Sequence, residues 1–125
     1  MGADELPRLA GLEGFELWDR TFHTPAHVPA KTAFVSVRIH GTVGISLACY
    51  AMWGSPPACL AMFDPERRRL ALKPCEPGAP NSFPLDDRQK DVPLRNLFAY
   101  YGVQIVETRR YYDPKVMDAV LVVDL

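Results

Sequence analysis

The sequence has almost no net charge, no long apolar run and few cysteines, and each absence excludes a class of protein. The formal net charge is −1, from 14 basic and 15 acidic side chains, so no overall field attracts nucleic acid or an anionic membrane. No apolar run is long enough to cross a membrane, and the N-terminus lacks the basic segment and apolar core of a secretory signal. We therefore expect a soluble, cytoplasmic protein without a membrane partner.

The sequence also lacks the residue patterns of a metal site or a catalytic centre. An odd number of cysteines, at spacings unlike those of zinc ligands, indicates three reduced thiols, Cys49, Cys59 and Cys75. His23 and His27 would share a face only in a helix, which the prolines around them disfavour. No nucleophile–base pair or phosphate-binding glycine loop is recognisable. We expect no metal, no cofactor and no catalytic residue, and we predict that the protein is not an enzyme.

What the sequence does have is a globular composition, with 48% hydrophobic and 23% charged residues among 125. A chain of this length can bury a sufficient core as one domain. Residues 1–14 are small and polar, which predicts a flexible N-terminal arm, and residues 15–125 are predicted to form a single domain. A proline-rich loop over 75–81 is predicted to join the two parts of this domain.

Alternating apolar residues and turn signals predict a mostly β domain with two short helices. Each predicted helix ends at a glycine, and the Asp-Pro pairs that begin at positions 64 and 113 predict turns. Strands are predicted over 32–39, 58–64, 68–74, 103–113 and 118–125, and helices over 48–54 and 92–102.

The two halves of the chain run through the same order of elements: an extended step, a short helix, a strand, an Asp-Pro turn and a strand. Landmarks recur at shifts of 47, 48 and 49 residues, in the pairs Leu47 and Leu94, Gly54 and Gly102, and Asp64 and Asp113. One such unit is too small to close a core, but two can bury their apolar faces against each other. We expect an α+β, mostly β fold of two β–short helix–β–β repeats, 32–74 and 82–125, packed about a pseudo-twofold axis as a barrel or sandwich. The alternative is chance agreement between common turn residues.

The first repeat, "VSVRIHGTVGISLACYAMWGSPPACLAMFDPERRRLALKP", resembles the AbrB/MraZ-type swapped-hairpin domain family. The family pattern is matched by a turn, an extended step, a helix end and a closing strand: His40-Gly41, Ile45-Ser46-Leu47, Trp53-Gly54 and Leu72-Lys73-Pro74. Residues 92–125 resemble a second, diverged copy. The resemblance implies a pseudo-dimeric swapped-hairpin fold in a single chain, and a DNA-binding function of the transcription-regulator or antitoxin type.

The family uses basic residues around the first strand and its turn to contact DNA. By position, the resemblance implies Lys31, Arg38 and His40 as contacts here, with Arg88, Lys90 and Arg95 in the second half. The hairpin arginines Arg67 and Arg69 would add phosphate contacts, or they would form a charged turn that protects an exposed sheet edge. The predicted partner is double-stranded DNA, and a homodimer would double any basic face.

A rival hypothesis is a protein-interaction or scaffold module on the same fold that does not bind nucleic acid. It is favoured by the low net charge and by three acids that stand where the second copy would need basic residues, Asp86, Asp87 and Asp91. The placement of charge discriminates between the two hypotheses. Basic residues on a face clear of these acids favour DNA binding, and interleaved acids favour the rival.

Aromatic residues provide the candidate surface for a protein partner. They occur at matching places in the two predicted helices, as Tyr50, Trp53, Tyr100 and Tyr101. Most of them are expected in the core, and those left at the surface would form a docking patch, since Tyr and Trp are enriched in binding hot spots. The run Arg109-Arg110-Tyr111-Tyr112 combines cations with stacking surfaces, as single-strand binders do. The alternative is a strand with tyrosines inside and arginines outside.

Overall fold

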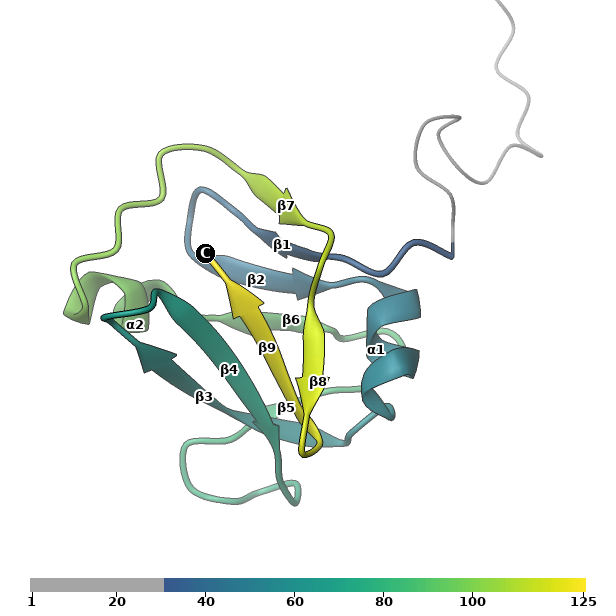
Figure 1. The fold of residues 1–125 in the computed structure, drawn as a ribbon. Coiled ribbons are helices and arrows are strands. Elements are labelled where there is room, and N and C mark those ends of the chain that lie inside the picture. Colours follow the sequence, from purple (N-terminus) through teal and green to yellow (C-terminus); the bar gives the residue numbers. More distant parts are fainter. Residues whose placement is uncertain (1–30) are drawn as a thin grey trace, which may run out of the picture.

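Two antiparallel sheets and two short helices enclose a common core in the computed structural model, which describes residues 31–125 (Figure 1). The predicted α+β, mostly β class is confirmed at this level. The predicted arm over 1–14 and the segment 15–30 lie outside the described residues.

Sheet A has four short strands in the order β6-β2-β1-β7. Their bounds are β1 Val35–Val37, β2 Thr42–Ile45, β6 Asp91–Pro93 and β7 Arg109–Tyr111. The register places Val37 opposite Val43, and Val43 opposite Val92, so one row of valines crosses three strands and is buried in the core. The alternate row, which runs through Ser36 and Gly44, therefore faces outward.

Sheet B has five strands in the order β5-β3-β4-β9-β8. Their bounds are β3 Ala58–Asp64, β4 Arg69–Pro74, β5 Phe83–Pro84, β8 Lys115–Met117 and β9 Val120–Asp124. The hairpins β3–β4 and β8–β9 lie side by side, because β4 pairs with β9. Leu70, Leu72, Leu121 and Val123 point into the core from the two central strands.

The helices are positioned by their first residues. Helix α1 (Leu47–Trp53) is capped by Ser46, whose hydroxyl accepts from the backbone N–H of Cys49 and also from that of Phe34 on the neighbouring segment. It ends at Gly54, which has a left-handed φ of 101°, as the sequence predicted. Helix α2 (Arg95–Tyr100) follows β6 and buries Phe98.

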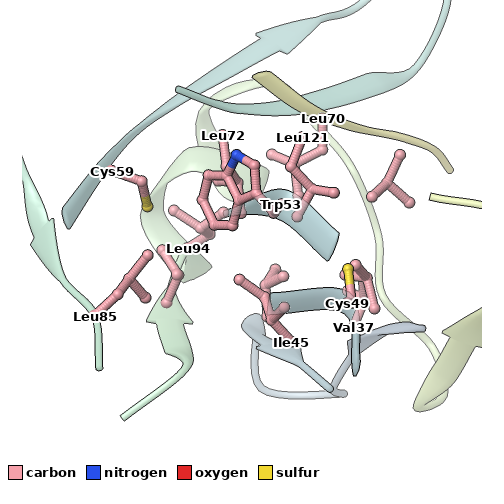
Figure 2. Close-up of a cluster of buried hydrophobic side chains, with 14 of the residues drawn as sticks. Val37, Ile45, Cys49, Trp53, Cys59, Leu70, Leu72, Leu85, Leu94 and Leu121 are labelled. Carbon is pink, nitrogen blue, oxygen red and sulfur yellow. The ribbon is translucent and has the colours of Figure 1, made fainter. Parts of the chain in front are cut away.

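The core between the sheets is built around α1 (Figure 2). Trp53 is 4% exposed, and its indole N–H donates to the carbonyl of Ala119 in the β8–β9 turn at 2.8 Å. Around it lie aliphatic and thiol side chains from both sheets, from α1 itself and from the start of α2: Val37, Ile45, Cys49, Cys59, Leu70, Leu72, Leu94 and Leu121. Trp53 thus ties the first half of the chain to the last hairpin.

Some predicted strands are shorter than expected. The segment 58–64 is a strand with the predicted bounds, but 32–39 narrows to β1 and 103–113 to β7. The strand β8 falls between two predicted elements. Short edge pieces of this kind take their pairing from a neighbouring strand and carry little periodicity of their own.

Candidate functional surfaces

The outer face of sheet A carries an ion pair that spans the sheet. Arg38 extends from the end of β1, and its Nη1 donates to Asp91 Oδ2 on β6 at 3.1 Å. The guanidinium passes over Gly44, where a Cβ atom would come within 3.0 Å of Arg38 Nη2 and 2.9 Å of Ser36 Oγ. A residue with a Cβ atom at position 44 would clash with the ion pair, so the ion pair depends on glycine here.

A second feature of this face is an aromatic–arginine cluster, Phe34, Arg110 and Tyr112. The Arg110 guanidinium lies over the Phe34 ring at 4.7 Å, and the Phe34 and Tyr112 rings are 5.7 Å apart. Arg110 and Tyr112 are two residues apart on and beside β7, so they share one face. Tyr111 points the other way and packs against the core. The alternative prediction placed both tyrosines of this run inside the protein. Tyr111 is inside, as that alternative predicted, but Tyr112 is exposed.

The predicted DNA contacts come from two different sheets. Lys31 and His40 are exposed, at the start of the described chain and in the β1–β2 turn, and Arg38 lies beside that turn. Arg67 and Arg69 belong to the β3–β4 hairpin of sheet B. Two of the three hairpin arginines contact an aspartate: Arg67 Nη1 lies 3.5 Å from Asp64 Oδ2, and Arg69 Nε lies 2.8 Å from Asp124 Oδ1.

Acids also border the second-half cations. Asp86 accepts the backbone N–H groups of Gln89 and Arg88, both at 2.7 Å, and these bonds lower the pKa of its carboxyl. The carboxylate is therefore held in the same short loop as Arg88. Asp86 beside Arg88, and Asp91 beside Arg38, therefore place acidic side chains among the basic residues that the resemblance implies as DNA contacts.

The predicted aromatic patch is divided by the fold. Tyr50 and Trp53 are buried, and the Tyr50 hydroxyl donates to the carbonyl of Pro56, so neither can contact a partner. Their prediction as partner-binding residues is wrong, because α1 lies between the sheets with its aromatic side inward. Tyr100 is 82% exposed at the end of α2, and Tyr101 packs on Phe63 of β3 with ring centroids 5.1 Å apart.

The outer face of sheet B is unusually apolar. Its side chains alternate with the buried leucines, and six of them are apolar: Leu60, Met62, Ala71, Met117, Val120 and Val122. Met62 is 44% exposed and Met117 is 52% exposed. An antiparallel sheet with one solvated face normally alternates apolar and polar residues, whereas β3 and β9 read as strands buried on both faces. The Tyr100–Tyr101 pair does not belong to this face, since Tyr101 contacts Phe63, which alternates with Met62 and packs toward the core.

The remaining features offer little chemistry. A pocket of about 280 Å³ lies beside β7, but the Arg109 in its wall is paired with Glu107 at 3.5 Å. Burial raises the pKa of the Cys49 thiol to about 11 and that of Cys59 to about 12, which keeps both protonated and unreactive. Residues 31–125 contain no cluster of His, Cys, Asp or Glu side chains arranged to hold a metal ion. Neither helix in this part of the chain is long and apolar enough to span a membrane.

No family model, no curated protein and no solved structure matches this chain. The function of these surfaces is therefore inferred from their own geometry and charge.

Two surfaces were not predicted from the sequence. The aromatic–arginine cluster needs Phe34, which lies 76 residues before Arg110 and reaches it only through the β1–β7 pairing. The apolar face of sheet B does have a local signal. The closing strand, Val-Leu-Val-Val, is apolar at every position instead of alternating, which predicts burial on both faces.

Proposed function

We propose that the protein is a non-enzymatic protein-interaction module on a mostly β fold. The observation that carries this proposal is the apolar outer face of sheet B, on which Met62 lies opposite Ala71, Met117 lies opposite Val120, and both methionines are about half exposed. Exposed apolar faces of this kind mark interaction surfaces in soluble proteins. Tyr100 and Tyr101 are exposed elsewhere, at the end of α2, and are of the residue type enriched in binding hot spots.

The charge distribution supports the same choice over duplex binding. Phosphate contacts need cations that are free to replace counterions. Arg38, Arg67 and Arg69 each contact an aspartate, and the contacts divide between two sheets. By the charge-placement criterion, the interleaved acids favour the interaction module. DNA binding through Lys31, Arg38, His40, Arg67 and Arg69 stays a prediction with less support.

The test combines a nucleic-acid assay with a surface variant. We expect no binding of the full chain to a labelled random-sequence duplex, measured by fluorescence anisotropy even at low salt. We also expect in-cell cross-linking to yield adducts that Met62→Glu removes and Met52→Glu retains, because Met52 is similarly exposed but lies on α1. Duplex binding that weakens steeply with salt would contradict the proposal, as would adducts that are insensitive to Met62→Glu.

A second candidate function is single-strand nucleic-acid binding on sheet A. The specific observation is the aromatic–arginine cluster, because Arg110 over Phe34 beside the exposed Tyr112 offers both a cation and stacking surfaces. Each stacked base contributes about 1–3 kcal/mol. If this function is present, an oligonucleotide will bind at moderate salt, Phe34→Leu will weaken binding at least about tenfold, and Arg67→Ala will leave it unchanged. Equal affinity of wild type and Phe34→Leu would contradict it.

We further propose that the fold is a fused pseudo-dimer of swapped-hairpin type. Two pairs of strands cross between the halves, β2 with β6 and β4 with β9, and both registers contain a pair separated by 49 residues: Val43 with Val92, and Leu72 with Leu121. This is also the sequence shift between the two Asp-Pro pairs. In addition, β1 pairs with β7 of the second half as well as with β2 of its own half, and β5 pairs with β3 of the first half.

Separating the halves tests the pseudo-dimer. We expect co-expressed fragments 1–78 and 79–125 to assemble into a folded 1:1 complex, because the core is shared between them. Each fragment alone should be unfolded by circular dichroism. A fragment that folds as an independent monomer would contradict the proposal.

A further inference from the structure

The connection between α2 and β7 has the side-chain pattern of a strand, but it belongs to neither sheet of the described chain (Figure 1). Val103 is buried and Ile105 packs against the core, whereas Gln104 and Val106 are exposed. Three of these four residues are β-branched, and alternating burial of β-branched residues is typical of a strand. The connection is therefore suited to pairing, although residues 31–125 supply no neighbouring strand for it.

The backbone polar groups of this connection are correspondingly open. The N–H of Val103 donates to the carbonyl of Phe98 and closes the end of α2. Within the described part of the chain, the N–H and carbonyl groups of residues 104–107 form no backbone hydrogen bond. A run of open backbone groups is a template for pairing with another chain.

A pocket of about 280 Å³ lies against the same segment, and residues 103–107 form one of its walls. Across from them lie Val37 and Tyr111 of sheet A and Leu125 at the end of sheet B. Val37 and Val103 are buried, so the base of the pocket is apolar. Its volume is just below the range of about 300–1,000 Å³ that is usual for ligand pockets, which suits a side chain better than a large cofactor.

Two arginines line this pocket, and they differ in their partners. Arg109 Nη2 lies 3.5 Å from Glu107 Oε1. Arg68, in the β3–β4 turn, has no ion-pair partner in the described part of the chain. Its carbonyl accepts the backbone N–H of Leu125 at 2.9 Å, which holds the turn beside the pocket. The lining therefore has one positive charge that no acid there compensates.

We propose that residues 103–107 bind an extended peptide segment of a partner protein as an added strand. One aliphatic side chain of the peptide enters the pocket, and an acidic side chain lies beside Arg68. In this mode of recognition the backbone hydrogen bonds give affinity and the side-chain pocket gives specificity. The site shares no residue with the apolar outer face of sheet B, so it goes beyond the proposed function and can fail independently of it.

The first test is amide hydrogen exchange of the full chain, followed by NMR. The probe is an acetylated and amidated hexapeptide of alternating threonine and valine that ends in glutamate. Amides 104–107 should exchange fast in the free protein and more slowly with the peptide at about 1 mM. The same peptide with every backbone N–H methylated keeps its side chains but cannot pair, and it should give no protection.

The second test uses proline to remove single N–H groups. An added strand bonds to alternate residues, so Val106→Pro and Glu107→Pro remove donors on opposite edges. One of them should weaken peptide binding at least about tenfold. Val106→Ala and Glu107→Ala keep the N–H and are the matched controls, and circular dichroism checks that each variant is folded.

The third test concerns charge. Arg68 has φ 53°, a conformation that asparagine tolerates, so Arg68→Asn removes the charge without straining the turn. It should weaken binding of the glutamate peptide roughly two- to fivefold. A peptide with glutamine in place of glutamate should bind wild type and Arg68→Asn equally.

Several outcomes would overturn the inference. Amides 104–107 that are already protected in the free chain would show that the edge is occupied. Absence of peptide binding, protection by the methylated peptide, or two proline variants that bind like wild type would each exclude strand addition. Met62→Glu should leave peptide binding unchanged, so loss of its cross-links with retained peptide binding, or the reverse, separates this inference from the proposed function.

Discussion

Arg38 and Asp91 are 53 residues apart in the sequence, yet Arg38 Nη1 donates to Asp91 Oδ2 at 3.1 Å. The pairing of β2 with β6 brings them together, since Gly44 lies opposite Asp91 and the guanidinium crosses this glycine. The residue that the family resemblance implies as a DNA contact in the first half is thus paired with a carboxylate from the second half. This contact weighs most against duplex binding.

The Arg38–Asp91 pair should add little to stability. Both side chains are nearly half exposed, and exposed pairs contribute up to about 1 kcal/mol. A double-mutant cycle with Arg38→Met and Asp91→Asn, measured by urea unfolding, should give a coupling of this size that fades in high salt. Asp91→Asn also frees Arg38. If DNA binding is latent in this face, the variant will bind duplex where the wild type does not.

Gly41→Ala should be among the most destabilising small changes in the chain. Gly41 has φ 86°, and an added Cβ would lie 2.6 Å from Arg95 Cα at the start of α2. We expect a loss of about 2–4 kcal/mol in the free energy of unfolding. Gly78→Ala is the control, because its φ of 83° is similar but nothing lies near the added atom, and it should cost about 1–2 kcal/mol. Equal losses would show that the close approach to α2 contributes nothing.

Ser46 should stabilise two elements at once. Its hydroxyl caps α1, accepts from the Phe34 N–H at 2.9 Å and donates to the Thr32 carbonyl at 3.2 Å. We expect Ser46→Ala to lower the free energy of unfolding by about 1–2 kcal/mol. Ser46→Thr keeps the hydroxyl and should retain most of the stability in thermal unfolding. A neutral Ser46→Ala would mean that water replaces these bonds.

The buried thiols should make stability fall in alkaline solution. Burial raises the pKa of Cys59 from 9.0 to about 12 in the folded protein, so the unfolded chain loses this proton first. The stabilising contribution is complete below about pH 9 and declines as pH rises toward 12. Urea unfolding should show a shallower decline for Cys59→Ala than for wild type over this range.

Thiol reactivity gives an independent measurement of the same burial. At mildly alkaline pH a disulfide reagent should modify the partly exposed Cys75 first, and reach Cys49 and Cys59 only on unfolding. Rapid modification of all three thiols in the native protein would contradict this burial.

Much of the local structure could be predicted from the sequence. The strand 58–64, the stop of α1 at Gly54 and the turn that begins at Asp64 each depend on short-range signals: alternation, a left-handed glycine and a side chain that accepts from the next turn residues. The strands of two or three residues could not be predicted, because β5 and β8 exist only where a neighbouring strand pairs with them.

The candidate surfaces were harder to predict than the elements. Tyr50 and Trp53 looked like candidates for a docking patch, and only the position of α1 between the sheets shows that they are core. The cluster of Phe34 with Arg110, and the pairing of Arg38 with Asp91, join residues from opposite halves. No window of sequence contains both members of either contact.

The sequence by itself determined the class of fold and the turn that begins at Asp64, because φ preferences, proline and apolar alternation act within a few residues. The second predicted turn, at Asp113-Pro114, is wrong, since the last hairpin turns at Asp118-Ala119. The sequence also contained the signal for the apolar outer face of sheet B, in the four successive apolar residues that begin β9. Only the tertiary structure decided which charges are neutralised and which aromatics are exposed. Those properties depend on cross-strand neighbours, and the pairing of β2 with β6 and of β4 with β9 sets these neighbours across about fifty residues of chain.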